Sequence, residues 1–567
     1  MSAKDRLPSK GGGPSPHPAG QADAAGASAS SGAAEAQGAA RLAPAWSGRD
    51  AFIYSFFSIN LVTLGLYIVS QAWYFHGGMI PALIVGALLV FSEVLVYAAL
   101  IVAIPGSGGD YLWQSRLLGK AAGFILAITG WCFILWLWTP IYGDILRQVV
   151  LVPLAAVLGF GPVALTISGS KVVWFAIILL MVLFVLVVIA KGMAFYAKVQ
   201  RFCFWAGNAG LLAVAIVLFA GDKANFHSAF DLASLKLFGI PNAYDAVRAA
   251  GEAAGATTPL WGGDPGQILL LLPFLAFFNL WPNTGASLSG EVRGAHEFRR
   301  NVATMGGALA ATTALLVLVL LAIDRGIGWN FYMDANAAYW SGRSHPEAAA
   351  VQPYWPYPAL LAVMTIPSTL LRVAILLAMG AWFFGWAGTI YLSSTRIIFS
   401  AAFDRLLPAG LSQVDEKSKS PFKALLFMVV PGLIVSALYV WNVFGFASLT
   451  LMSTAVIAIT FLGTAVAAIL FPFVKKELYL ASPLARFRLG PLPLISLAGL
   501  VFAAFLGFLL YEWLVDPADL FGISWRNATS LAFLGAMYAL AALLYLWLRG
   551  LGRKPAADID GIFEDEE

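Results

Sequence analysis

The amino-acid sequence predicts an all-α integral membrane protein with about twelve spanning helices. Of its 567 residues, 60% are hydrophobic and only 11% are charged, whereas a soluble domain carries roughly 25% charged residues. The charges lie in short clusters between apolar runs of about twenty residues or more, the length with which a helix crosses a hydrocarbon core of about 30 Å. These two observations exclude an ordinary soluble protein.

The apolar runs can be assigned to twelve spans. The eighth run is too long for one helix, so we expect a loop or a short re-entrant helix near Pro367 and a helix from about Leu371. The predicted spans lie near residues 50–74, 79–103, 121–148, 170–190, 197–220, 267–290, 302–323, 358–400, 422–442, 446–474, 493–514 and 528–549.

A third observation is the distribution of Lys and Arg between the loops. These residues are concentrated in the loops that share a side with the N-terminus and are scarce in the alternate loops. Because short cytoplasmic loops are enriched in Lys and Arg, both chain ends are predicted to lie in the cytoplasm, and the protein in the plasma membrane. The basic residues form no nucleic-acid patch, so lipid is the expected surrounding and nucleic acid is not an expected partner.

The segments outside the spans are short or of simple composition. Residues 1–48 are rich in Ala, Gly, Ser and Pro without a continuous apolar core, which predicts a disordered cytoplasmic tail. Residues 551–567 are predicted to form a second cytoplasmic tail. Two long loops, an extracellular loop over 221–266 and another near 325–357, are expected to shape or cover an outer vestibule.

The sixth span contains an interruption. Its residues 278–285 read Phe-Asn-Leu-Trp-Pro-Asn-Thr-Gly, and Pro282 lacks an N–H and clashes with the preceding helical turn. Irregular backbone at membrane depth is tolerated only where it is buried in protein or lines a cavity. The sequence therefore predicts a broken helix here, although a simple proline kink is the competing interpretation.

The first span contains a weaker interruption, Ser-Ile-Asn-Leu-Val-Thr-Leu-Gly over residues 58–65. Small and polar residues can equally mark a helix-packing face. However, the first and sixth spans are five spans apart, so they would be equivalent helices of two inverted repeats, and broken helices in such positions mark solute sites. The repeats would be residues 49–220 and 267–474, with two further helices in 475–550.

Three local patterns carry a resemblance to a known family. Residues 104–116, Ile-Pro-Gly-Ser-Gly-Gly-Asp-Tyr-Leu-Trp-Gln-Ser-Arg, follow the second span. Gly-Glu-Val-Arg at 290–293 closes the sixth, and Ser394-Thr395-Arg396 precedes Asp-Arg-Leu-Leu-Pro at 404–408 and Lys-Ser-Pro at 419–421. In this order they closely resemble the signatures of amino acid permeases of the amino acid–polyamine–organocation superfamily, over about residues 48–550.

The resemblance implies a LeuT-like core of five plus five helices, with two C-terminal helices and alternating access. In such transporters the substrate carboxylate meets N–H groups of the broken first helix, and the amino group meets carbonyls of both breaks. Trp281 stands where the family often has an aromatic gate. The first span lacks the family's usual glycine-rich run. Carried onto this chain, the substrate-binding residues are Asn60, Leu61, Val62, Thr63, Leu64, Gly65, Phe278, Asn279, Trp281, Pro282, Asn283 and Thr284.

Ionisable residues inside spans are candidates for coupling or gating. Glu93, near the middle of the second span, could carry a coupling proton or serve as a structural hydrogen-bond partner. Asp144 and Arg147 are expected to form a local ion pair near the vestibule, with gating as the alternative role. Glu291 is expected to anchor an inner gate with nearby arginines.

The coupling ion is left open between a proton, sodium and a counter-substrate. The lysine that stands in the fifth helix of some relatives is absent near Gly207 and Asn208. Thr389 and Ser393 in the eighth span could contribute to a sodium site, or their hydroxyls could bond their own helix backbone. No other metal and no cofactor is expected.

The predicted function is secondary transport of an amino acid, with exchange of amino acids or polyamines as the alternative. Neither break contains Asp, Glu, Lys or Arg, which favours a neutral substrate. Aromatic residues near the presumed cavity favour a bulky one: Trp131, Trp136, Trp138, Phe277, Phe278, Trp281 and Trp382. A membrane-embedded enzyme would need a catalytic cluster, yet the five histidines fall in tails, loops or span ends. A channel would need a ring of filter residues, which the sequence does not show.

Overall fold

The computed structural model describes residues 42, 44–342, 346–415, 418–443, 446, 453–516 and 523–550. The predicted tails lie almost entirely outside these residues, as does most of the start of the tenth predicted span. The chain divides between Leu42 and Ala43, and the description below concerns the part after this division.

Twelve helical segments of the described chain are long and apolar enough to cross a membrane, which confirms the number predicted. The first five consist of α2 (Gly48–Ile59), η1 (Leu61–Gly65) and α3 (Leu66–Gln71); α4 (Met79–Ala103); α6 (Lys120–Ile128), η2 (Thr129–Phe133), α7 (Ile134–Leu146), η3 (Arg147–Leu151) and α8 (Val152–Val157); α10 (Lys171–Ala190); and α11 (Met193–Ala220).

The remaining seven spans follow the same order as the predicted ones. They consist of α14 (Pro265–Asn279) and η4 (Pro282–Glu291); α15 (Phe298–Gly326); α19 (Thr369–Phe403); α20 (Phe422–Val440); α21 (Ser453–Val474); α23 (Leu494–Val515); and α24 (Ala528–Gly550). The eighth predicted run is divided as expected, because α18 (Pro358–Met364) precedes α19 and Pro367 lies between them.

Local signals determine several helix starts. Ser47 and Asp50 form a reciprocal capping box at the start of α2. The side chains of Ser170 and Ser368 accept hydrogen bonds from the amides of Val173 and Leu371, and so cap α10 and α19. Between such caps, long apolar runs form helices because helical bonding satisfies the backbone without water.

The third span is longer than predicted. It continues past residue 148 to Val157 and contains two π-helical turns, η2 and η3. Pro153 does not end it, because this residue lies in the first turn of α8, where a missing N–H costs little.

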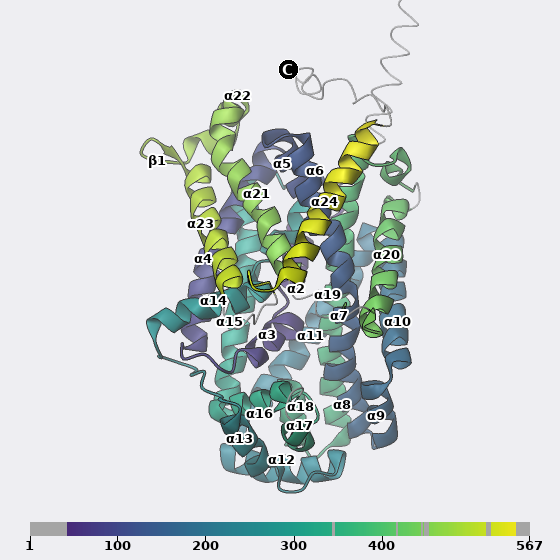
Figure 1. Cartoon of the computed structure of the whole chain (residues 1–567), viewed down its shortest axis with the longest axis vertical. Coiled ribbons are helices and arrows are strands. Elements are labelled where there is room, and N and C mark those ends of the chain that lie inside the picture. Colours follow the sequence, from purple (N-terminus) through teal and green to yellow (C-terminus); the bar gives the residue numbers. More distant parts are fainter. Residues whose placement is uncertain are drawn as a thin grey trace, which may run out of the picture. The chain divides into compact units, whose positions relative to one another are not determined.

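The shorter elements gather at the two ends of the bundle (Figure 1). One end, called here the α5 end, carries α5 (Asp110–Leu117), α22 (Lys476–Ala481) and a two-stranded hairpin in which β1 (Arg488–Leu489) pairs antiparallel with β2 (Leu492–Pro493). The 3₁₀ turns η5 (Ala409–Ser412) and η7 (Pro483–Arg486) complete the short elements before α23.

The opposite end carries α12 (Lys223–Phe238), α13 (Ala243–Ala253), α16 (Trp329–Ser341) and α17 (Pro346–Val351), together called the cap (Figure 1). The short helix α9 (Gly161–Gly169) packs against the end of the third span. The two long segments predicted as loops are therefore largely helical. Helix α13 lies close against α16: a Cβ on Gly251 would be only 2.3 Å from Cα of Asp334.

A cavity of about 590 Å³ opens within the cap. Charged residues of both signs line it, namely Lys223, Arg248, Glu252, Asp324 and Asp334. Lys223 pairs with Asp324 at 3.5 Å and Arg248 with Glu252 at 3.0 Å. Asp334 is only 5% exposed, and burial, reinforced by the nearby negative charge of Glu252, raises its pKa to about 6 against the pull of Arg248.

Asp334→Asn is expected to raise the melting temperature at pH 7.5. The folded chain holds the Asp334 proton up to about pH 6, whereas an unfolded Asp loses it near pH 3.9. The stability that the protonated carboxyl provides is therefore complete below about pH 4 and is lost as the pH rises through 6. Asparagine is neutral throughout, so its advantage should vanish near pH 4.

The measurement is thermal unfolding of the detergent-purified protein at both pH values. Glu252→Gln serves as a control because this side chain is largely exposed, and its effect should be smaller. An unchanged or lower melting temperature of Asp334→Asn at pH 7.5 would contradict the expectation.

Candidate functional site

The first span is broken at Asn60. Helix α2 ends at Ile59, and Asn60 adopts a left-handed conformation with φ 44°, which few residues other than Gly and Asn tolerate. The Asn60 side chain accepts a hydrogen bond from the Thr63 amide at 2.9 Å, and its carbonyl accepts from the amides of Leu64 and Gly65 at 3.1 Å. The interruption that the sequence indicated weakly is thus a break between the α-helix α2 and the π-helical turn η1.

The sixth span is broken between Asn279 and Pro282. Helix α14 ends at Asn279, Trp281 has the non-helical angles φ −134° and ψ 12°, and Pro282 begins the 3₁₀ helix η4. Pro282 therefore begins a new segment and does not kink a continuous helix. The Trp281 ring nitrogen donates to the carbonyl of Phe277 at 2.9 Å, which fixes the side chain across the break.

The two breaks contact each other. A Cβ on Gly65 would lie 3.0 Å from the ring of Phe278, so a larger residue here would require the ring to shift. On the other side of the break, the Trp281 ring meets Trp138 edge-on at 5.0 Å between centroids and Phe461 at 6.1 Å. The backbone breaks are thus flanked by an aromatic wall from α7 and α21.

All twelve residues predicted to bind substrate are buried. Four of them nevertheless carry side-chain polar atoms without a hydrogen-bond partner in the described chain: Asn60 Nδ2, Thr63 Oγ1, Asn279 Oδ1, and both Oδ1 and Nδ2 of Asn283. Folded proteins rarely leave buried polar atoms unpaired. Both breaks therefore offer donors and acceptors suited to a polar solute.

Tyr357 is a contact that the sequence did not suggest. Its hydroxyl donates to the carbonyl of Val62 at 3.1 Å, from the turn just before α18. Nearby, Tyr67 of α3 packs edge-on against Trp340 and Trp355, each at 5.6 Å between centroids. Three of these aromatics, Trp340, Trp355 and Tyr357, lie in the segment predicted to be a loop near 325–357.

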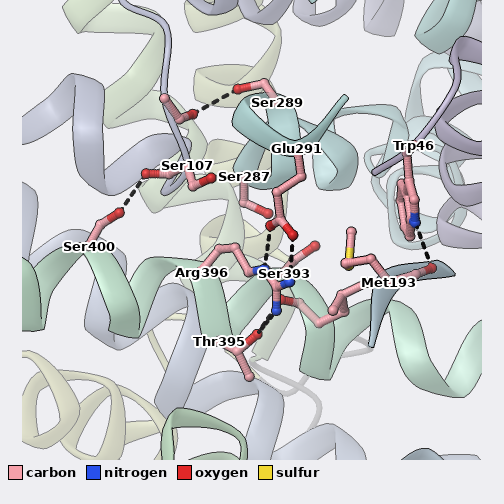
Figure 2. Close-up of polar contacts among 12 residues, drawn as sticks. Trp46, Ser107, Met193, Ser287, Ser289, Glu291, Ser393, Thr395, Arg396 and Ser400 are labelled. Atoms are coloured by element: carbon pink, nitrogen blue, oxygen red, sulfur yellow. Dashed lines mark hydrogen bonds and ion pairs between the residues drawn. The ribbon is translucent and has the colours of Figure 1, made fainter. Parts of the chain in front are cut away.

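Towards the α5 end, a buried ion pair joins η4 to α19. Glu291 Oε1 and Oε2 accept from Arg396 Nε and Nη2 at 2.7 and 2.8 Å (Figure 2). The side chains are 1% and 0% exposed. Arg396 also donates to Thr395 Oγ1 at 3.0 Å. The sequence suggested arginine partners for Glu291, and the structure identifies Arg396, 105 residues further along the chain.

The same region is closed by backbone and serine contacts. The Glu291 carbonyl accepts from the amides of Ala45 and Trp46, so the segment before α2 lies against the end of η4. Ser289 donates to the carbonyl of Gly106, and Ser400 donates to the carbonyl of Ser107, at 2.8 and 2.5 Å (Figure 2). These bonds hold the 105–109 loop between η4 and α19.

Thr389 and Ser393, the two sodium candidates, are engaged by protein groups. Thr389 Oγ1 donates to the Trp386 carbonyl of its own helix at 2.8 Å. Ser393 Oγ donates to the carbonyl of Thr284 at 2.8 Å and lies 2.6 Å from the hydroxyl of Tyr54, which donates to the Thr389 carbonyl. Ser393 thereby ties α19 to the sixth-span break.

Asp144 and Arg147 form the expected local ion pair, with 2.6 Å between Oδ1 and Nη2. Arg147 also donates to the carbonyl of Ser168 at 2.9 Å and stacks over the ring of Trp174 at 4.3 Å. Its contacts are with α9 and α10 and not with either break. Among the described residues, no three His, Cys, Asp or Glu side chains gather as a metal site would need.

Glu93 lies beside the sixth-span break. It is fully buried, and the amide of Asn283 faces its carboxyl, but neither carboxyl oxygen forms a hydrogen bond of ordinary geometry. A second buried carboxylate, Asp110 of α5, accepts hydrogen bonds from Tyr97, Trp131 and Thr464. Asp110 belongs to the 104–116 pattern, but the sequence gave no sign of this network.

Comparison with known proteins agrees with the three motifs. Residues 51–544 match the pattern of a family described as amino acid permease, a stretch that begins in α2, ends in α24 and includes both breaks. A search of curated proteins found no match. Because the family pattern covers most of the chain, the protein belongs to the amino acid permease family.

Proposed function

We propose that this protein carries neutral amino acids across the plasma membrane by alternating access, with the substrate bound between the first-span and sixth-span breaks. The observation that carries the proposal is the set of unpartnered buried polar atoms at Asn60, Thr63, Asn279 and Asn283. An amino acid zwitterion supplies both the donors and the acceptors that these atoms lack.

The hydrogen bonds of Asn60 limit which backbone amides are available to a substrate carboxylate. The amides of Thr63, Leu64 and Gly65 already bond to Asn60. The substrate carboxylate would therefore approach the backbone amides of Leu61 and Val62 and the side-chain amides of the asparagines in the two breaks. Each charge-assisted hydrogen bond contributes about 1.5–3 kcal/mol, so a few of them offset the loss of water from the zwitterion.

The composition of the two breaks supports a neutral substrate. Residues 58–65 and 278–285 contain no Asp, Glu, Lys or Arg, so a second substrate charge would find no counter-charge in the breaks themselves. Trp281, Trp138 and Phe461 offer an apolar wall for the substrate side chain. A bulky aliphatic or aromatic amino acid fits this wall best.

Alternating access is supported by the arrangement of the breaks and the inner contacts. The two broken spans are five spans apart, as two inverted repeats over 49–220 and 267–474 would require. The α5 end would face the cytoplasm, since Lys and Arg are enriched in its loops. In the described state this side would be closed by the Glu291–Arg396 pair, which must separate for release inward.

Trp281→Ala is expected to reduce amino acid transport by about tenfold or more. The substitution removes the aromatic wall and the bond across the break, and a loss of about 1.4 kcal/mol in binding already lowers affinity tenfold. The measurement is uptake and counterflow of labelled leucine, phenylalanine and methionine in proteoliposomes, together with stabilisation of the purified protein by the same amino acids against heating.

Trp205→Ala is the matched control, because this tryptophan of α11 is 61% exposed on the described surface. Transport by the control should equal that of the original chain. Unchanged ligand stabilisation in Trp281→Ala would place the site elsewhere. Counterflow without net uptake would identify an exchanger, and absence of any accumulation or exchange, under any sodium, proton or counter-substrate gradient, would refute the transporter proposal.

Glu291→Gln is expected to lower the melting temperature and to open the α5 side. Removing one partner of a buried pair leaves the other charge uncompensated, which costs about 3–5 kcal/mol. A cysteine placed at Ser289 should then react with a membrane-impermeant thiol reagent from the cytoplasmic side. The same cysteine in a protein that keeps the Glu291–Arg396 pair should react slowly.

Asp144→Asn provides the comparison, because it breaks the other ion pair without touching the inner contacts. It should leave the reactivity at position 289 unchanged. Equal reactivity in Glu291→Gln and in its parent would show that the pair does not close this side.

A further inference from the structure

Glu93 is an ionisable group in the middle of the membrane without a counter-charge. It lies midway along α4, is fully buried, and both carboxyl oxygens are unpartnered in the described chain. The negatively charged group that acts on it is Asp110, itself 2% exposed. An ionised carboxylate in such surroundings would have only the facing amide of Asn283 as a donor and no cation, so burial favours its neutral form.

The elements packed against α4 supply no cation to this position. The helices α14 and α21 contain no ionisable side chain, and η4 contains only Glu291, which is bound by Arg396. The ionisable groups of α15 and α23 lie near the helix ends. They are Arg299, Arg300, Asp324, Arg325, Tyr511 and Glu512. The 3₁₀ turn η7 also packs against α4 and carries Arg486, whose side chain is exposed and lies over the ring of Phe487. On α4 itself, the other ionisable group facing Glu93 is Tyr97.

The hydrogen bonds distinguish the two carboxyls. Asp110 accepts from the Tyr97 hydroxyl, the Thr464 hydroxyl and the Trp131 ring N–H, all of which donate. Three donors stabilise an anion, so Asp110 is the ionised member of the pair. Glu93 receives no side-chain donor, only the facing amide of Asn283, and the negative charge of Asp110 acts on it. The pair therefore holds one proton, and that proton belongs on Glu93.

The environment of Glu93 depends on the broken sixth span. The amide of Asn283 faces the carboxyl, and both polar atoms of the Asn283 side chain are unpartnered at 1% exposure. Any displacement of η4 that admits substrate or water therefore changes what surrounds Glu93. Water reaching the carboxyl would solvate its charged form and allow the proton to leave.

We propose that Glu93 is a proton-binding site that couples transport to the proton gradient, with Asp110 as a fixed anion and Asn283 as the link to the substrate site. Glu93 takes a proton from water on the outer side, carries it while the site is closed, and releases it to the cytoplasm, leaving a carboxylate that is reprotonated from outside. One proton thus enters with the substrate. This inference rests on the proposed transport function and names its coupling ion.

The test compares the original chain with Glu93→Gln in sodium-free proteoliposomes, using the same labelled leucine, phenylalanine and methionine. With an acidic exterior and alkaline interior, the original chain should accumulate label about tenfold above equilibrium, and the lumen should acidify when substrate is added. Glu93→Gln, which is permanently neutral, should retain counterflow, lose accumulation and move no protons. Glu512→Gln, a carboxyl near the end of α23, should behave as the original chain does.

The outcomes separate the two proposals. If the original chain shows no counterflow of any amino acid, the transport function fails. If counterflow is present but substrate moves no protons, or only a sodium gradient drives accumulation, proton coupling is overturned with transport intact. Accumulation by Glu93→Gln equal to that of the original chain excludes Glu93. If Glu93→Gln loses counterflow as well, Glu93→Asp is the deciding variant, and it should recover proton-driven accumulation. Return of counterflow in Glu93→Asp without proton-driven accumulation would overturn the assignment of the proton-binding site to Glu93.

Discussion

Hydrocarbon offers no hydrogen bonds to a polypeptide, and this constraint governs the whole molecule. Most spans meet it with continuous helices in which every central amide finds a carbonyl. Two spans do not, and the interruptions at Asn60 and at Leu280–Trp281 are therefore placed where other protein elements surround them. Every residue of both breaks is buried except Gly285, which is partly buried. The polar atoms that stay unpaired there are the basis for the proposed solute site.

The second organising feature is the set of contacts that converge on η4. This 3₁₀ segment binds α19 through Glu291 and Arg396, the 105–109 loop through Ser289, and the segment before α2 through the Glu291 carbonyl. Its other end, at Asn283, faces Glu93 of α4. The hydrogen-bond geometry of a 3₁₀ helix is also poorer than that of an α-helix. A displacement of η4 would alter the inner contacts and the surroundings of Glu93 together.

Much of the architecture follows from the sequence because span length and apolarity are local properties. The twelve spans, the division near Pro367 and the break at Pro282 all came from such signals. The break at Asn60 is harder to predict, since a single left-handed Asn in an apolar helix leaves only a weak signal in the sequence. The cap helices were missed because α12 and α13 are short and carry many polar residues. The pairing of Glu291 with Arg396 and the donors to Asp110 join residues far apart in sequence, and no periodicity encodes such contacts.

The self-bonded turn at Asn60 has a consequence for how strongly a solute can be held. Its side chain and carbonyl already occupy three amides that a carboxylate would otherwise use. A solute held only by the amides of Leu61 and Val62 would therefore make fewer backbone hydrogen bonds than one that could reach all five, and each such bond contributes about 1 kcal/mol. In the proposed carrier, a solute held by fewer bonds would bind less tightly and leave more readily, which favours release after each crossing.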